Sequence, residues 1–496
     1  MINDNEFMNR VAIIHNETVE YPHIPPFHPS RNYPEYVFRA EYLSDSNIAY
    51  DMVRECLKAL RMDINNYGSA AWNPFKTLVK KGDSVVIKPN FVQDYHDTGG
   101  EIFSVITHGS IIRAIIDYVS IALENEGHIC IADAPMMNSN FERIVEITGL
   151  REIADFYREK TNINISVVDL RVMRVDLEDG LVVRRHKLSG DPLGYRVVNL
   201  SENSMLHAVD KIYHKFRGSD YDIEQTIEHH NQDKHEYLIS NTVLNADLFI
   251  NVPKLKTHKK TGVSLNLKNL IGINGDKNWI PHYRIGGPNT SGDEFETQSY
   301  ARHFESFVKE EFKKFVYRFS LFNPVSKKIR KLQKLFIDKF NITPIRAGGW
   351  YGNDTLWRSV IDLNLILLHL DNGNQLNRII QRKYFSVVDG IIGAERNGPM
   401  NPEPKKSGVV IAGFSPITVD YCAIRLMGFD CEKIPLMKNI IRLKEYFGAV
   451  NIDDIEINSN DASFLNLTRD NFSRNDTLCF LAPDGWRDMI EIVRSH

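Results

Sequence analysis

Unbroken apolar runs alternate with runs of helical spacing along the chain. An apolar run at 10–15 is followed by helical spacing at 44–62. Three further apolar runs lie at 83–91, 128–135 and 163–170, and the two intervals between them show helical spacing at 110–123 and 140–160. Fully apolar strands that alternate with helices are typical of parallel strands covered on two sides. The pattern therefore predicts an α/β fold, in which a mostly parallel sheet carries helices on both faces.

Three later segments also place polar residues directly after an apolar strand. They lie at 246–258, 385–399 and 408–429, and the last of them continues into a helical pattern. The less regular residues 171–235 indicate a β-rich excursion with polar loops. The predicted organisation is one composite α/β core formed by 1–300 and 380–430, a helical insertion at 301–357, and a C-terminal extension at 431–496.

Composition and charge narrow the classes of function. The net charge of -4 across 496 residues gives no reason to expect nucleic acid as a partner. The five cysteines are far apart and form no Cys-x-x-Cys pair, so an iron–sulfur cluster or a structural zinc module is not expected. Sparse cysteines, no apolar run long enough for a membrane span and no secretory-type N-terminus together predict a cytoplasmic protein.

The predicted insertion differs in charge from the rest of the chain. From Arg302 to Lys339 it has eleven Lys or Arg against four Asp or Glu, with phenylalanines interleaved. One interpretation is an amphipathic helical segment that packs its aromatic face on the core and leaves its lysines in solvent. A second is that residues 301–340 contact a membrane surface or a lipid-linked substrate, and a third is contact with nucleic acid.

Polar residues follow five of the predicted strands at the points where the strands end. Ligands of open parallel sheets sit outside the carboxyl ends of the strands, so these side chains are candidates for one site. Lys88 directly follows four apolar residues and must therefore either pair or reach a ligand. The segment 251–279 is the richest in cations and amides, although it would also fit a basic surface loop. Within it, residues 263–270 are either a helix or an irregular buried segment.

Each residue type at the strand ends suggests a role. Lysines and amides hold anions, histidines move protons near neutral pH, and carboxylates bind hard cations such as Mg²⁺. Structural alternatives remain open, since His108 would also fit a helix cap, and Asp133 and Asp389 would also fit ordinary turns. The candidates are Lys88, Asn90, Lys254, Lys256, Lys268 and Asn269 for the anion, His108, His258 and His282 for proton transfer, and Asp133, Asp389 and Glu395 for a divalent cation.

The motifs at these strand ends resemble a known family. "SVVIKPNF", "THGSIIRAIIDYV", "IADAP", "ADLFINVPKLKTHKKTGVSLNLKNLIG" and "VVDGIIGAERNGP" occur in this order in the family numbered 362 among domains of unknown function. The resemblance covers roughly residues 80–290 and 385–430. Many members of that family carry a ferredoxin-like iron–sulfur module, but this chain lacks the cysteines that such a module needs.

A second likeness concerns the order of three motifs. Thr-His followed by Gly, then a Lys- and Gly-rich loop, then Pro-His resembles the lactate racemase family, which uses a nickel–pincer nucleotide. That resemblance implies that His108 and His282 handle a proton next to a carboxylate and that Lys268 anchors the cofactor.

These observations predict an enzyme that acts on a small anionic or phosphorylated substrate, which is sugar- or nucleotide-linked in one version of the hypothesis. Lys, His and Asp residues at the carboxyl edge of the sheet would form its site. One alternative is a non-catalytic protein that binds an anion or assembles with a partner. Another is a metal-dependent, racemase-like isomerase or transferase.

Overall fold

The computed structural model describes residues 8–38, 42–178, 181–218, 222–296, 347–447, 452–469 and 472–492. The basic aromatic segment 301–340 lies outside these ranges, so its helical character and its proposed membrane contact remain predictions. Within the described ranges, no helix is both long and apolar enough to cross a membrane.

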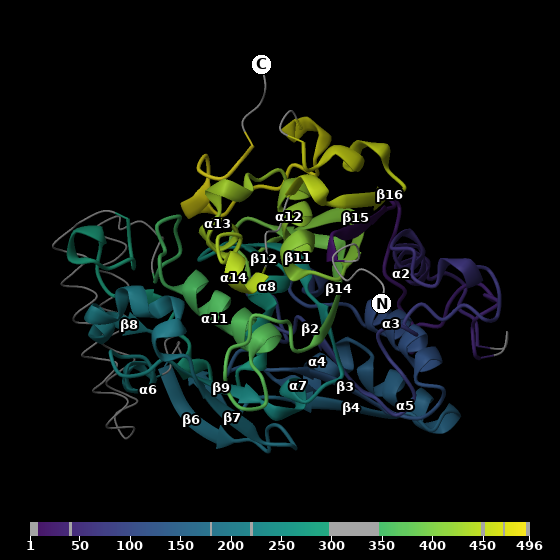
Figure 1. The fold of residues 1–496 in the computed structure, drawn as a ribbon, viewed down its shortest axis with the longest axis horizontal. Helices are drawn as coiled ribbons and strands as arrows, with labels where there is room; N and C mark the ends of the chain where they lie inside the picture. The colour runs from purple at the N-terminus through teal and green to yellow at the C-terminus, as the bar shows by residue number, and fades with distance from the viewer. Residues whose placement is uncertain are drawn as a thin grey trace.

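A large, mostly parallel sheet forms the centre of the molecule (Figure 1). Its strands run in the order β16-β1-β15-β14-β10-β2-β3-β4, and β11 and β12 extend from β14. The pairings from β14 through β10, β2 and β3 to β4 are all parallel, whereas β15 is antiparallel to both of its neighbours. The strands are β1 (Arg10–His15), β2 (Ser84–Pro89), β3 (His128–Asp133), β4 (Asn164–Asp169), β10 (Leu248–Val252), β11 (Lys254–His258), β12 (Gly262–Ser264), β14 (Lys383–Glu395), β15 (Glu403–Gly413) and β16 (Glu456–Ser459).

Helices cover both faces of this sheet, as the sequence predicts. Side chains of a strand point alternately to opposite faces, so Val85 and Ile87 join one hydrophobic core while Val86 joins another. Figure 1 shows the two helix groups on either side of the strands. One face packs against α2 (Ile48–Ala59), α3 (Gly109–Ala122), α4 (Phe141–Ile147) and α5 (Leu150–Lys160), and the other against α11 (Leu356–His369), α12 (Pro416–Met427) and α13 (Pro435–Ile440).

Two helical details differ from the sequence pattern. The run at 140–160 is two helices, because Gly149 has φ +65° and a Cβ at this position would meet Pro25 and Phe27 at 2.7 and 3.0 Å. Helix α11 is not predicted; nearly all of its residues are buried, which weakens the amphipathic period that marks a helix in the sequence.

Smaller sheets and the C-terminal residues complete the fold. Residues 171–235 are predicted to be β-rich, but they contain short strands and helical turns in similar measure. Their strands pair as β5 (Met173–Glu178) with β6 (Leu181–Lys187) and as β7 (Tyr195–Asn199) with the following β9 (Glu236–Ser240). The short strands β8 (Phe216–Arg217) and β13 (Tyr283–Arg284) also pair. Beyond residue 431, β16 pairs in parallel with β1 at the edge of the central sheet (Figure 1, top). This part of the chain is therefore continuous with the core.

Candidate functional site

A cavity of about 270 Å³ lies at the carboxyl ends of β2 and β3, beneath the segment that follows β10. The site is therefore at the edge where parallel sheets bind ligands. It combines many polar groups with an apolar wall. The polar lining is Lys88, Asn90, Asp133, His258, Lys259, Lys260, Ser264, Lys268, Asn269, Lys277 and His282, and the apolar lining includes Phe91, Val92, Pro135, Met136, Ile271, Ala347, Pro399 and Met400.

Positive charge dominates the lining. Five lysines face a single carboxylate, that of Asp133. Asp133 already lies 2.8 Å from the ammonium of Lys88, and it accepts a hydrogen bond from the backbone N–H of Phe91. Lys268 and Lys277 have no carboxylate of their own in the lining, and an anion would supply the missing negative charge.

A chain of buried amides holds the back of the cavity. The side-chain oxygen of Asn269 accepts hydrogen bonds from Lys88 and from the amide of Asn90, while its nitrogen donates to Asn251. Lys256 lies behind the lining, where it donates to Asn90 Oδ1 at 2.5 Å and to the carbonyl of Val105. Each of these groups is buried, so the network fixes the lysines in place.

Two lysines of the lining are poised to change protonation state. Burial lowers the pKa of Lys268 to about 7, and the nearby Lys260 and Lys88 ammonium groups act in the same direction. Burial also lowers the pKa of Lys277 to about 7, although Asp133 opposes this shift. Lys277 donates to the carbonyl of Ile271, whereas Lys268 Nζ makes no hydrogen bond or ion pair within the described residues. Lys268 is thus available to a ligand.

The two histidines that line the cavity have opposite hydrogen-bonding roles at Nε2. His258 Nδ1 accepts a hydrogen bond from the backbone N–H of Lys260, so in the neutral ring the proton is on Nε2. His282 Nδ1 must donate, because its partner is the carbonyl oxygen of Ile280 at 2.7 Å, and this leaves a lone pair on Nε2. Burial, together with neighbouring lysines, keeps the pKa of both rings well below the usual value. At neutral pH the cavity therefore holds one neutral donor and one neutral acceptor.

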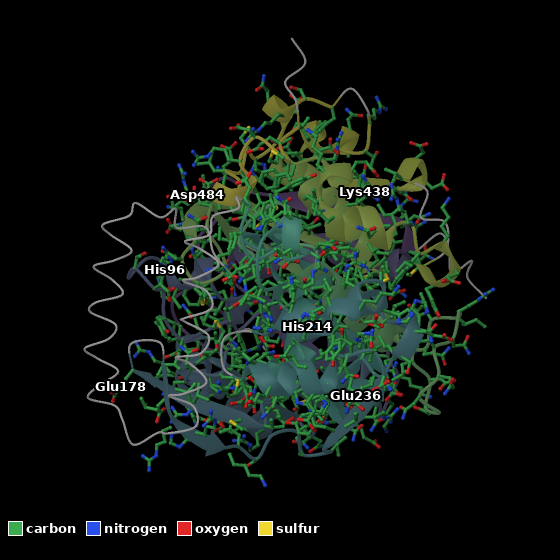
Figure 2. All side chains as sticks on the ribbon, turned by 90° about the vertical axis from the view of Figure 1, so that its left-hand side faces the viewer. His96, Glu178, His214, Glu236, Lys438 and Asp484 are labelled. Atoms are coloured by element: carbon green, nitrogen blue, oxygen red, sulfur yellow. The ribbon has the colours of Figure 1, made fainter. Side chains whose placement is uncertain are left out.

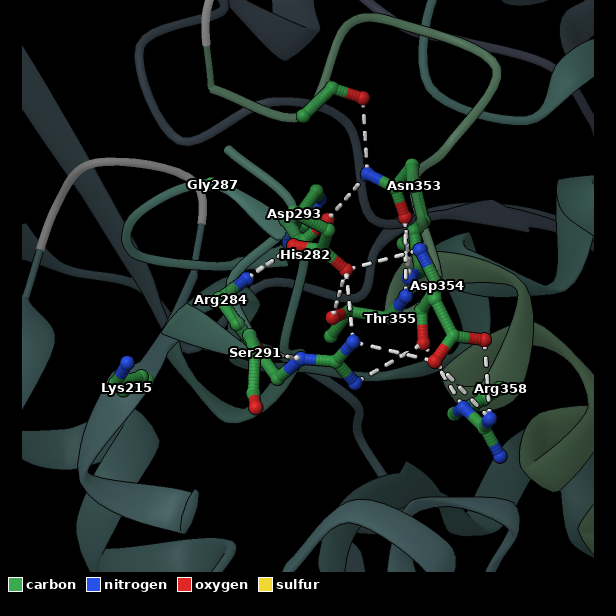
Figure 3. A network of polar contacts seen from close by, with 12 residues as sticks. Lys215, His282, Arg284, Gly287, Ser291, Asp293, Asn353, Asp354, Thr355 and Arg358 are labelled. Carbon is green, nitrogen blue, oxygen red and sulfur yellow. Dashed lines mark hydrogen bonds and ion pairs between the residues drawn. The ribbon is translucent and has the colours of Figure 1, made fainter. Parts of the chain in front are cut away.

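The loop that carries His282 is anchored from outside the cavity (Figure 3). The amide of Asn353 donates to the backbone carbonyl of His282 at 3.0 Å. Next to it, the buried Asp293 carboxylate accepts from Thr355 Oγ1 and from the backbone N–H groups of Arg284 and Asp354. These contacts fix the backbone on the C-terminal side of His282, so they position the imidazole.

His108 and Lys254 belong to a different, fully buried cluster. Lys254 Nζ lies 3.1 Å from Asp389 Oδ2 and donates to Tyr21, whose ring stacks on that of His108. The His108 side chain caps α3 by accepting from the backbone N–H of Ser110, which is the structural alternative noted for it. None of these residues lines the cavity, so the structure does not bring His108 together with Lys268 and His282.

The three carboxylates predicted to share a divalent cation lie apart. Asp133 pairs with Lys88, Asp389 with Lys254, and Glu395 with Lys405 and the backbone N–H of Leu481. Among the described residues they do not form a cluster with metal-ligand spacing. Strand ends on one edge of a sheet lie near each other, but β14 continues past Asp389 to Glu395, so these two carboxylates meet different neighbours.

Several residues of the site were not singled out from the sequence. Lys260 and Lys277 lie in the predicted cationic segment, so its composition could have identified them. No sequence motif around Asp420 pointed to the site. The Asp420 carboxylate, on α12, accepts hydrogen bonds from the backbone N–H groups of Asn266 and Leu267. These bonds orient the single turn α8 (Asn266–Asn269) that carries Lys268. Residues 263–270 are therefore a short strand followed by this turn, rather than one longer helix.

The Lys254–Asp389 pair is predicted to stabilise the fold without contributing to the cavity. Replacing Lys254 with Met would leave a buried, uncompensated carboxylate, so we expect urea denaturation to show a loss of roughly 3–5 kcal/mol. The matched control is Lys406→Met, whose partner Glu20 is 73% exposed, and its stability should equal that of the wild type within error. Equal stabilities for the two variants would contradict this assignment.

Gly272 is predicted to be essential to the shape of the site. A Cβ at this position would lie 1.9 Å from Asp133 Oδ1 and 2.6 Å from Lys88 Nζ, so Gly272→Ala must push the ion pair away. We expect a loss of roughly 1–3 kcal/mol, as overpacked interiors show. Gly373→Ala is the control for thermal unfolding, because a Cβ there would approach only the side chain of Asp371, at 3.3 Å. A Gly272→Ala protein with wild-type melting temperature would contradict the close approach.

Comparison with known proteins identifies a family. The family model described as "Domain of unknown function (DUF362)" matches residues 197–425, which include the lysine-rich segment and β14. Lys88, Asn90 and Asp133 lie before the matched residues and complete the cavity from β2 and β3. No curated protein matches the chain. The match supports the resemblance inferred from the motifs, and residues 197–425 of this chain are similar to the DUF362 family.

Proposed function

We propose that this protein is an enzyme that binds a small anionic or phosphorylated substrate in the cavity at the edge of the sheet and moves a proton on it. The observation that supports this most strongly is the pair of neutral histidines with opposite Nε2 roles beside a lysine that has no partner among the described residues. A site that only bound anions would not need this pair.

Each polar group has a distinct task in the proposal. Lys268 and Lys277 hold the phosphate or carboxylate, and anion binding restores the charge that burial removes. His282 Nε2 accepts a proton from the substrate, because its pKa leaves it neutral and its Nδ1–H is already committed to Ile280. His258 Nε2–H donates a hydrogen bond to oxygen that gains negative charge in the reaction, since a neutral imidazole is a donor but a poor acid.

The apolar wall adds a requirement on the substrate. Phe91, Met136 and Met400 line the same cavity as the lysines. A bare inorganic anion would leave this wall in contact with water, so the proposed substrate carries an apolar or planar portion next to its anionic group. A sugar- or nucleotide-linked substrate, as considered from the sequence, meets this requirement through its ring.

Two of the alternatives gain less from the structure. The racemase-like mechanism needs His108 beside His282 and Lys268, and His108 lies in the other cluster. A non-catalytic anion-binding protein would use the same lysines, so only a measurement of turnover distinguishes it from an enzyme. A cytoplasmic location and the absence of nucleic acid from the partners remain predictions, which the five unpaired cysteines and the charge of -4 support.

The pH dependence of anion binding tests the role of the lysines. Sulfate is a suitable probe, because its charge is constant between pH 6 and pH 9 and both histidines stay neutral there. Lys268 and Lys277 are mostly protonated below pH 7 and lose their protons above it, so sulfate affinity should fall by roughly tenfold or more from pH 6 to pH 9. Isothermal titration calorimetry should show proton uptake on binding at pH 8.

Substitution of Lys268 tests the site itself. Loss of one charge-assisted hydrogen bond costs about 1.5–3 kcal/mol, so Lys268→Met should weaken sulfate binding at pH 6 by roughly 10–150-fold. Lys187→Met, on an exposed part of β6, is the control. Turnover of a phosphorylated substrate found by screening should be abolished in His282→Gln with little change in binding. Unchanged sulfate affinity in folded Lys268→Met would contradict the proposal.

A further inference from the structure

A second cluster of ligating side chains lies away from the cavity, on the side of the molecule that carries His214 and Glu236 (Figure 2). It contains His207 and Asp210 of the 3₁₀ helix η4 (Met205–Lys215) and His235, which immediately precedes β9. Residues three apart eclipse each other on a 3₁₀ helix, so His207 and Asp210 project in the same direction. The ligand atoms of all three residues lie within 4.8 Å of one another.

A relay of hydrogen bonds fixes the protonation of His235. His230 Nε2 lies 2.6 Å from the backbone carbonyl of Trp279 and must donate to it. His230 Nδ1 is then an acceptor, and His235 Nδ1 donates to it at 3.4 Å. This leaves a lone pair on His235 Nε2, which is buried and makes no hydrogen bond.

The lone pair of His235 therefore faces another acceptor. Its Nε2 is 3.8 Å from Asp210 Oδ2, and His207 Nδ1 lies 2.8 Å from the same oxygen. Two acceptors that face each other with no proton between them repel, and a cation placed between them removes the repulsion. His235 is 1% exposed, so bulk water does not screen this contact.

The spacing and ligand types fit a transition metal. Zinc takes imidazole nitrogen and carboxylate oxygen at about 2.0–2.2 Å, and tetrahedral ligands at that bond length are roughly 3.3 Å apart. The distances from Asp210 Oδ2 to His207 Nδ1 and His235 Nε2, 2.8 and 3.8 Å, lie on either side of this value. An outer partner that fixes the tautomer of a ligating histidine, as His230 does here, is a regular feature of metal sites. The side chain of His207 is 54% exposed, so the fourth position is open to solvent.

We propose that His207, Asp210 and His235 bind a divalent transition-metal ion such as Zn²⁺. His230 orients the site, and its bond to Trp279 connects the metal to the segment that carries Lys277 and His282. The ion thus braces one wall of the anion cavity from outside. Nothing in this proposal depends on the reaction that takes place in the cavity.

Titration of metal-stripped, full-length protein with Zn²⁺ against a chromogenic chelator tests the proposal. We expect one Zn²⁺ per chain in the wild type. His207→Gln, at an exposed position that leaves the core intact, should weaken binding by roughly 100-fold, and His230→Gln, which removes only the orienting partner, by roughly 10–100-fold. Circular dichroism establishes that each variant is folded.

Two controls separate this site from ordinary histidine–zinc contacts. His214→Gln removes an exposed histidine from the same helix η4, and His186→Gln breaks a His–Asp pair of 2.7 Å that does not belong to a three-residue cluster. Both should bind Zn²⁺ like the wild type. Wild-type affinity in His207→Gln, or an equal loss in His214→Gln, would overturn the proposal.

Discussion

The structure depends on how it accommodates cations at the buried carboxyl edge of a parallel sheet. A lysine ammonium loses much of its hydration there, and it is retained only if a carboxylate, an amide or a ligand replaces the lost water. Lys88 has Asp133, Lys254 has Asp389, and Lys256 has the oxygen of Asn90 and a backbone carbonyl. Lys268 has no such compensation among the described residues, and burial together with the nearby Lys260 and Lys88 ammonium groups lowers its pKa to about 7. The candidate site therefore lies where a buried lysine has no protein group, within the described ranges, to replace its lost hydration.

This distinction separates two kinds of lysine that look alike in the sequence. Lys254 and Lys256 are two residues apart on β11, and both belong to the scaffold behind the cavity. Lys268 and Lys277 follow in the next segments and belong to the cavity itself. The contacts of Lys254 and Lys256 link β11 to Asp389 of β14 and to Asn90, which directly follows β2. These contacts hold the backbone around the cavity, and Lys268 and Lys277 line the cavity where the proposed anion binds.

The fold and the place of the site could be predicted because both follow from short-range patterns. Apolar runs such as 83–91 identify buried strands, and the polar residues after them identify the edge. The grouping of the side chains could not be predicted in the same way. His108 looked like a proton carrier, but its side chain caps α3 and stacks on Tyr21, which is distant in sequence. Asp420 orients the turn that carries Lys268 from a distance of 154 positions along the chain, and no local pattern encodes that contact.

The central claim, that the cavity attracts an anion, can be tested most directly by crystallography with selenate, a sulfate analogue that scatters anomalously. We predict an anomalous peak within hydrogen-bonding distance of Lys268 Nζ and Lys277 Nζ, between His258 and His282, in crystals grown near pH 6. An empty cavity at selenate concentrations that fill other surface sites would contradict the account.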